Sequence, residues 1–194
     1  YLVLDKSYAE LPNFEGAKYV MSPPLRDVSN QEVFWNALRK RFVSTIATDH
    51  APFDFVGQKE MGRDDFTKIP NGIPSLEDRV NLLYTHGVAA GRIDLSTFVD
   101  AASTQAAKIF GMFPRKGAIA IGSDADLVVY DPNYRGSISA KTHQLNLDYS
   151  AFEGWEIKGR PSTVTVRGEV AVQDGKFVGT IGRGKFVKRE PNHF

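Results

Sequence analysis

Apolar positions in the first part of the chain change between a continuous and a helical pattern. A short apolar stretch at 17–21 reaches Ser22 just before two prolines, which cannot donate to a strand ladder, so a strand ending at Ser22 is predicted. The β-branched run at 43–48 predicts a second strand, parallel to the first. Between them, a capping box of Ser29 and Glu32 opens a predicted helix. Its apolar face comprises Val33, Phe34, Ala37, Leu38 and Phe42.

Two more helical patterns follow a long polar loop at 51–74. That loop is rich in glycine and proline and longer than an ordinary connection, which favours a functional role. Ser75 with Asp78 predicts the start of a helix that ends at Gly87, and the next helix is predicted to stop at Gly111. Their apolar faces comprise Leu76, Val80 and Leu83, and then Leu95, Phe98, Val99, Ala102, Ala106 and Ile109.

After Lys116 the apolar positions alternate with period two. This pattern predicts an all-β module, and Asp174-Gly175 indicates a type I′ hairpin turn. We therefore expect an α/β domain over 1–116, a β domain over 117–182 and a C-terminal tail over 183–194, for which solvation is favoured over a subunit contact. The predicted strands are 127–130, 162–166, 169–172 and 176–178.

Composition narrows the classes of partner. The 194 residues carry 24 basic and 23 acidic side chains, a net charge of +1, which gives no reason to expect nucleic acid or an anionic membrane. With no cysteine, disulfides and thiolate metal ligands are excluded, and a cytoplasmic protein is the default. No apolar run reaches the roughly 20 residues needed to span a bilayer. The abrupt start at Tyr1 is typical of the interior of a longer protein.

The strongest chemical candidate is Asp49, at the end of the apolar run 43–48. A carboxylate at the carboxyl end of a buried parallel strand lies where α/β barrels keep their chemistry. Taken alone, such an aspartate is more often a helix cap or a satisfied core carboxylate. His50 should point to the opposite face unless the chain turns there, so a packing role is favoured. His86, His143 and His193 are expected to be surface or capping residues.

Five motifs, taken together and in this order, resemble the dihydropyrimidinase and D-hydantoinase family of cyclic amidohydrolases. They are Ser22-Pro23-Pro24-Leu25-Arg26, Thr48-Asp49-His50-Ala51-Pro52-Phe53, Ile69-Pro70-Asn71-Gly72, Glu77-Asp78-Arg79-Val80 and Gly122-Ser123-Asp124-Ala125-Asp126-Leu127-Val128. The resemblance implies the C-terminal part of a (β/α)8 TIM barrel followed by a small β-sandwich. It also implies two divalent metal ions, usually zinc, whose histidine ligands and carboxylated lysine would precede Tyr1, leaving Asp49 as the ligand in this chain.

The resemblance also implies roles for three residues. Asp49 would bind one metal and move a proton from the attacking hydroxide to the ring nitrogen. Ser22 and Asn71 would bind the substrate through their backbone, and Gly72 would let the chain approach it closely. Without the resemblance, Ser22 is a strand terminus and Asn71 a turn former. The loop 53–67, which includes Lys59, Arg63 and Asp64, could border the site, but its charges are expected to be solvated. Ala51 stands where many relatives carry cysteine.

The activity implied by this resemblance is metal-dependent hydrolysis of hydantoins or dihydropyrimidines to N-carbamoyl amino acids. Its partners would be a small cyclic amide, the N-terminal part of the barrel and further copies of the protein as a homo-oligomer, dimer or tetramer. The chain alone is expected to be inactive. Two alternatives stay open. A non-catalytic scaffold like the collapsin response mediators would differ from the enzyme in its metal content. An allantoinase would differ in the substrates that it hydrolyses, which a substrate panel measures.

Overall fold

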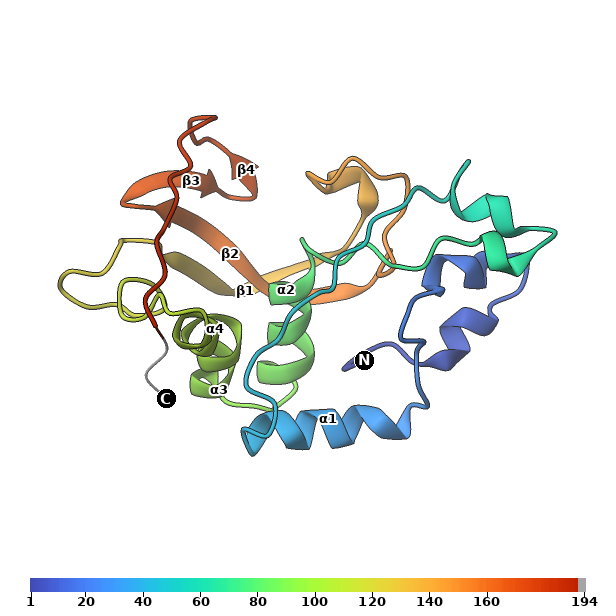
Figure 1. Cartoon of the computed structure of the whole chain (residues 1–194), viewed down its shortest axis with the longest axis horizontal. Helices are drawn as coiled ribbons and strands as arrows, with labels where there is room; N and C mark the ends of the chain where they lie inside the picture. The colour runs from blue at the N-terminus through green and yellow to red at the C-terminus, as the bar shows by residue number, and fades with distance from the viewer. Residues whose placement is uncertain (192–194) are drawn as a thin grey trace.

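Helices and extended segments make up the first two-thirds of the chain, and an antiparallel sheet follows (Figure 1). The structure, a computed structural model, describes residues 1–191. The α-helices are α1 (Ser29–Arg39), α2 (Arg79–Leu83), α3 (Leu95–Val99) and α4 (Gln105–Ile109), and the π-helical turns are η5 (Tyr84–Val88) and η6 (Asp100–Thr104). The 3₁₀ turns are η1 (Lys6–Glu10), η2 (Glu15–Tyr19), η3 (Lys59–Gly62), η4 (Phe66–Lys68) and η7 (Ala140–Thr142). The strands are β1 (Val128–Ser137), β2 (Glu156–Val166), β3 (Glu169–Gln173) and β4 (Lys176–Phe177).

Both predicted parallel strands are wrong as regular strands. Residues 17–19 belong to the 3₁₀ turn η2, and 43–48 are extended without forming a ladder. Single backbone hydrogen bonds fix these segments instead: Gly72 N donates to Val20 O at 3.0 Å, and Ile46 N donates to Ala101 O at 3.2 Å. A strand needs a neighbouring strand to accept and donate its backbone hydrogen bonds, and residues 1–191 provide none beside either segment.

The predicted first helix is confirmed as α1, but its capping box is not. Asp27 Oδ1 accepts from Ser29 N at 3.1 Å, while Glu32 forms an ion pair with Arg92. The buried side chains of α1 are Trp35 and Leu38. Of the predicted apolar face, Val33, Phe34 and Phe42 are exposed, because this helix packs with Trp35 inward.

The second helix begins four residues later than predicted, at Arg79. Asp78 makes no cap and instead bonds His143 Nε2 at 2.9 Å. Gly87 is not a C-terminal cap either, since it is buried inside η5, where an added Cβ would lie 3.0 Å from atoms of Trp35 and Ile93. The helix therefore extends through η5 because a glycine there allows close packing on α1.

The third predicted helix is confirmed as the continuous run α3, η6 and α4. Asp94 caps its start by accepting from Thr97 N at 2.7 Å. Gly111 ends it with a left-handed φ of 66°, as expected for a residue that follows a helix.

The predicted β region forms one antiparallel sheet in the order β1-β2-β3-β4. Strands β1 and β2 are longer than predicted, and Asp174 and Gly175 have φ of 50° and 78°, the two positive values that a type I′ turn requires. The sheet packs on the helices through Tyr130, whose ring lies 4.5 Å from that of Tyr84. The division into domains at residue 116 stays a prediction.

Residues 183–191 of the C-terminal tail are mostly exposed, but Arg183 and Glu190 attach them to the rest of the chain. Arg183 Nη2 donates to Val166 O at 2.7 Å, and Glu190 N donates to Gly111 O at 2.8 Å. His193 lies outside the described residues. Residues 1–191 contain no helix of the length and hydrophobicity that a bilayer-crossing segment needs.

Candidate active site

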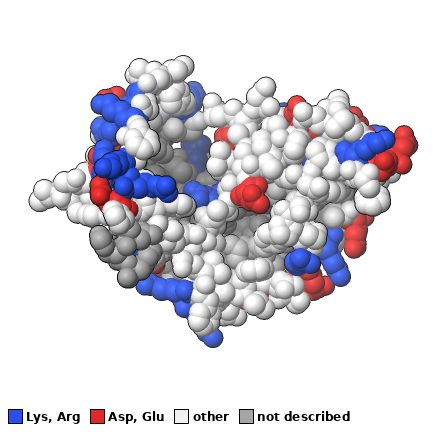
Figure 2. Space-filling view, viewed as in Figure 1, with Lys and Arg blue, Asp and Glu red and all other residues white. Residues whose placement is uncertain are grey.

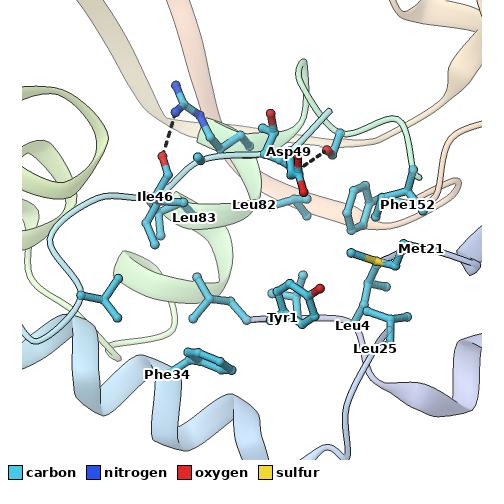
Figure 3. A pocket seen from close by; sticks show the side chains of 18 of the residues that line it. Tyr1, Leu4, Met21, Leu25, Phe34, Ile46, Asp49, Leu82, Leu83 and Phe152 are labelled. Atoms are coloured by element: carbon cyan, nitrogen blue, oxygen red, sulfur yellow. Dashed lines mark hydrogen bonds between the residues drawn. The ribbon is translucent and has the colours of Figure 1, made fainter. Parts of the chain in front are cut away.

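A cavity of about 300 Å³ lies between the N-terminal segment and the extended segment 43–49. Figure 3 shows Asp49 on one side of this cavity, with Leu25 and Phe34 on the other. Most of the lining is apolar. Figure 2 shows charged side chains mainly toward the edges of the visible face, with an acidic group near its middle. The polar side chains of the lining are Tyr1, Thr45, Thr48, Asp49, Ser75 and Arg79.

Asp49 has an unusual backbone conformation. Its φ is 48°, in the left-handed region, so the chain turns at this residue rather than continuing as a strand. The carboxylate is exposed and accepts no hydrogen bond from residues 1–191. Asp49 is therefore neither a helix cap nor a satisfied core carboxylate.

The carboxylate of Asp49 affects the pKa of Tyr1, which also lines the cavity. Burial raises the pKa of Tyr1, Arg26 opposes the rise, and Asp49 adds to it. Tyr1 Oη donates to Pro23 O at 2.5 Å.

His50 is turned away from the cavity. Its Nδ1 accepts hydrogen bonds from the backbone of Ser75 at 3.1 Å and Leu76 at 3.3 Å. Ser75 Oγ donates to Thr48 O at 3.3 Å, the contact drawn in Figure 3. These contacts are those of a packing residue, because the ring of His50 joins the chain just after Asp49 to the segment that leads into α2.

Ser22 and Asn71 are exposed and do not line the cavity, but their segments are joined at its rim. Gly72 N donates to Val20 O at 3.0 Å, which connects the two segments. Gly72 also touches the Asp49 segment, since a Cβ added there would lie 2.4 Å from the Ala51 Cβ and 2.6 Å from its carbonyl oxygen. The segments of Ser22, Asp49 and Asn71 therefore meet. The residue that Gly72 approaches closely is Ala51.

Lys59 is the residue of this site whose burial the sequence did not predict. It was expected to be solvated, yet it is fully buried, with 0% of its surface exposed. Its Nζ donates to the carbonyls of Val20 at 3.0 Å, Pro70 at 2.7 Å and Gly72 at 2.8 Å. Burial lowers the pKa of Lys59 from 10.5 to about 8. Arg63 is half exposed and pairs with Glu60, as a solvated charge would.

Two of the histidines expected at the surface are partly buried. The Nε2 of His86 is buried without a hydrogen-bond partner among residues 1–191, and burial lowers the pKa of this ring. His143 pairs with the buried Asp78. Burial raises the pKa of Asp78, and the adjacent His143 opposes that rise. Their positions follow from contacts with distant residues rather than from local sequence.

The described part of the chain brings together no group of three histidine, aspartate or glutamate side chains able to hold a metal ion. Asp49 fits the chemistry of a single ligand, because its carboxylate is exposed at a cavity and accepts no hydrogen bond from the described residues. The other ligands of such a metal would have to come from outside residues 1–191.

Comparisons with known proteins identify relatives of this chain. A sequence profile of the Amidohydrolase family matches residues 20–171. The chain is 58% identical over 189 residues to a D-hydantoinase of Geobacillus stearothermophilus, covering 97% of this chain and 40% of the relative. It is 38% identical over 191 residues to a D-phenylhydantoinase of Escherichia coli, covering 98% of this chain and 41% of the relative.

Solved structures confirm the predicted barrel-type fold class. A D-hydantoinase (dihydropyrimidinase) from Thermus sp. superposes with a TM-score of 0.95 at 64% identity, over 100% of this chain and 42% of that one. An L-hydantoinase (dihydropyrimidinase) from Arthrobacter aurescens superposes with a TM-score of 0.84 at 31% identity, over 97% of this chain and 41% of that one. The chain thus spans about 40% of the length of the relatives it matches. It belongs to the amidohydrolase family, with D-hydantoinases and dihydropyrimidinases among its relatives.

Proposed function

We propose that the protein to which this chain belongs hydrolyses cyclic amides, hydantoins or dihydropyrimidines, to N-carbamoyl amino acids. One observation carries the proposal: the carboxylate of Asp49, which accepts no hydrogen bond within residues 1–191, lies at a cavity in a chain 58% identical to a D-hydantoinase. Opening a cyclic amide needs a nucleophile at the carbonyl and a proton for the departing nitrogen. Asp49 suits the second task.

In this proposal Asp49 would hold a divalent metal through its carboxylate, which would also carry a proton during the reaction. Bound metal would supply a polarised carbonyl and a water of lowered pKa. Asp49 takes the proton released as water attacks the carbonyl and gives it to the ring nitrogen as the C–N bond breaks. Asp49 is exposed and no donor among residues 1–191 binds it, so both carboxylate oxygens are available.

The substrate ring would be held by backbone groups of Ser22 and Asn71. No described residue hydrogen-bonds the N–H or C=O of Asn71, or those of Ser22, and both residues are exposed beside the cavity rim. Unpaired donors and acceptors of this kind match the alternating N–H and C=O edge of a cyclic amide. The side-chain identities at Ser22 and Asn71 matter less than their backbone positions.

Three finer properties belong to the same proposal. The metal is zinc, present as a pair of ions, with the remaining ligands, a carboxylated lysine among them, outside this chain. The protein is a cytoplasmic homo-oligomer, a dimer or a tetramer. Its remaining partners are the cyclic amide and the N-terminal part of the barrel, without nucleic acid or membrane.

Metal content and turnover together test the proposed function. We expect the complete protein to hold about two metal ions per subunit and to open a hydantoin or dihydropyrimidine ring. We expect the 194-residue chain alone to do neither, because Asp49 has no second metal ligand near it among residues 1–191. Elemental analysis and a substrate panel that includes allantoin measure both. A complete protein that binds no metal would be a scaffold, and turnover of allantoin alone would make it an allantoinase.

A further inference from the structure

The buried ammonium of Lys59 lies between the two segments that carry Ser22 and Asn71. It comes from η3, in the long loop, and its three hydrogen bonds reach carbonyls on both segments. An ammonium group has three N–H donors, so all of them are used. None of the ion pairs within residues 1–191 includes Lys59, and its partners are neutral carbonyls together with the ring of Phe53, whose centroid lies 5.8 Å from Nζ.

The three carbonyls that Lys59 binds determine which backbone groups stay free. Pro70 O and Gly72 O flank Asn71, and Lys59 is their sole hydrogen-bond donor within the described chain. The Gly72 N–H is taken by Val20 O. Within residues 1–191 the N–H and C=O of Asn71 itself have no partner, and Asn71 is an exposed residue between two carbonyls that Lys59 binds.

The same ammonium fixes the distance between the two segments. Val20 lies two residues before Ser22, and its carbonyl accepts from both Lys59 Nζ and Gly72 N. Lys59 is held in turn by its own loop, since its backbone N–H donates to Asp54 O at 3.0 Å. The N–H groups of Phe55 and Val56 donate to the carboxylate of Asp148 at 2.7 and 2.8 Å. The ammonium therefore reaches the rim from a loop that is itself anchored.

We propose that Lys59 is a positioning residue, which sets the spacing and direction of the backbone groups of Ser22 and Asn71 that receive the cyclic amide. It does not touch the substrate. The inference rests on the proposed function, because it assigns Lys59 to the same substrate edge. Burying a charge among neutral carbonyls is costly, and the cost is offset when all three N–H groups are bonded, as they are here.

Replacing Lys59 in the complete protein tests this role. Lys59→Met keeps the length of the side chain and removes all three donors, so we expect KM for a cyclic amide to rise about tenfold or more, with a much smaller change in kcat. Lys59→Gln keeps two N–H donors and should raise KM less. Lys68→Met is the matched control, since Lys68 lies in the same loop with 66% of its side chain exposed, and its KM should equal that of the wild type.

Amide hydrogen exchange supplies a readout that does not depend on turnover. We expect the Gly72 amide, which donates to Val20 O, to exchange faster in Lys59→Met than in the wild type or in Lys68→Met. A wild-type KM in folded Lys59→Met, or in Lys59→Gln should the first variant not fold, would overturn the inference while leaving the proposed function intact. Faster exchange in a protein that opens no cyclic amide would instead reject the proposed function.

Discussion

Replacing Asp49 by Asn in the complete protein should lower kcat/KM for a cyclic amide by at least about 10³-fold. Asparagine has nearly the same size, so the left-handed turn at φ 48° is preserved, and asparagine is well tolerated in that conformation. The amide cannot accept and release the proton that the ring nitrogen needs, and it is a weaker metal ligand than a carboxylate. Steady-state kinetics of purified variant and wild type measure the loss.

A matched control separates this effect from a general effect of charge. Asp64 is also exposed, on the long loop away from the cavity lining, and Asp64→Asn should leave kcat/KM within about twofold of the wild type. Full activity in Asp49→Asn would remove Asp49 from the mechanism. An equal loss in both variants would show that the protein responds to its net charge rather than to this carboxylate.

Replacing Gly72 by Ala should be the most damaging change at the rim of the site. Its φ of 142° is a conformation that residues with a Cβ rarely adopt, and the new methyl would overlap Ala51 at 2.4 Å. The backbone strain and the overlap together should lower the free energy of unfolding by about 3 kcal/mol or more. Because Ala51 follows Asp49 by two residues, the shift should also separate the Asn71 segment from Asp49 and lower kcat/KM about 100-fold.

Gly57 provides the control for this prediction. It has a left-handed φ of 76° in the same loop, and a Cβ added there would meet nothing within 4 Å. Gly57→Ala should therefore show only the smaller cost of the backbone conformation, about 1 kcal/mol, with turnover unchanged. Denaturant unfolding and steady-state kinetics of both variants measure these effects. Equal losses of unfolding free energy and of kcat/KM in the two variants would mean that contact with Ala51 does not shape the site.

Sequence patterns predicted the elements that form through contacts between residues near one another in the chain. The helix α1 and the run from α3 to α4 follow from apolar spacing, and the Asp174-Gly175 turn follows from its need for two positive φ values. Sequence failed where an element depends on distant partners. The segments 17–22 and 43–48 have the composition of strands, but no neighbouring strand pairs with them among the described residues.

The candidate site shows the same limit. Asp49 was found because a carboxylate after an apolar run is a recognisable signal. Lys59 was missed because a lysine in a polar loop gives no local sign of burial, and its carbonyl partners Val20 and Gly72 lie 39 and 13 residues away. His143 was misplaced for the same reason, since Asp78 lies 65 residues from it.

The position of a metal relative to Asp49 tests the proposed function most directly. Anomalous diffraction from crystals of the complete protein, collected on both sides of the zinc absorption edge, would locate the ion independently of turnover. We predict an anomalous peak with an Asp49 carboxylate oxygen about 2.0–2.2 Å from it. A zinc site elsewhere, or none, with the Asp49 carboxylate surrounded by solvent, would contradict the proposal.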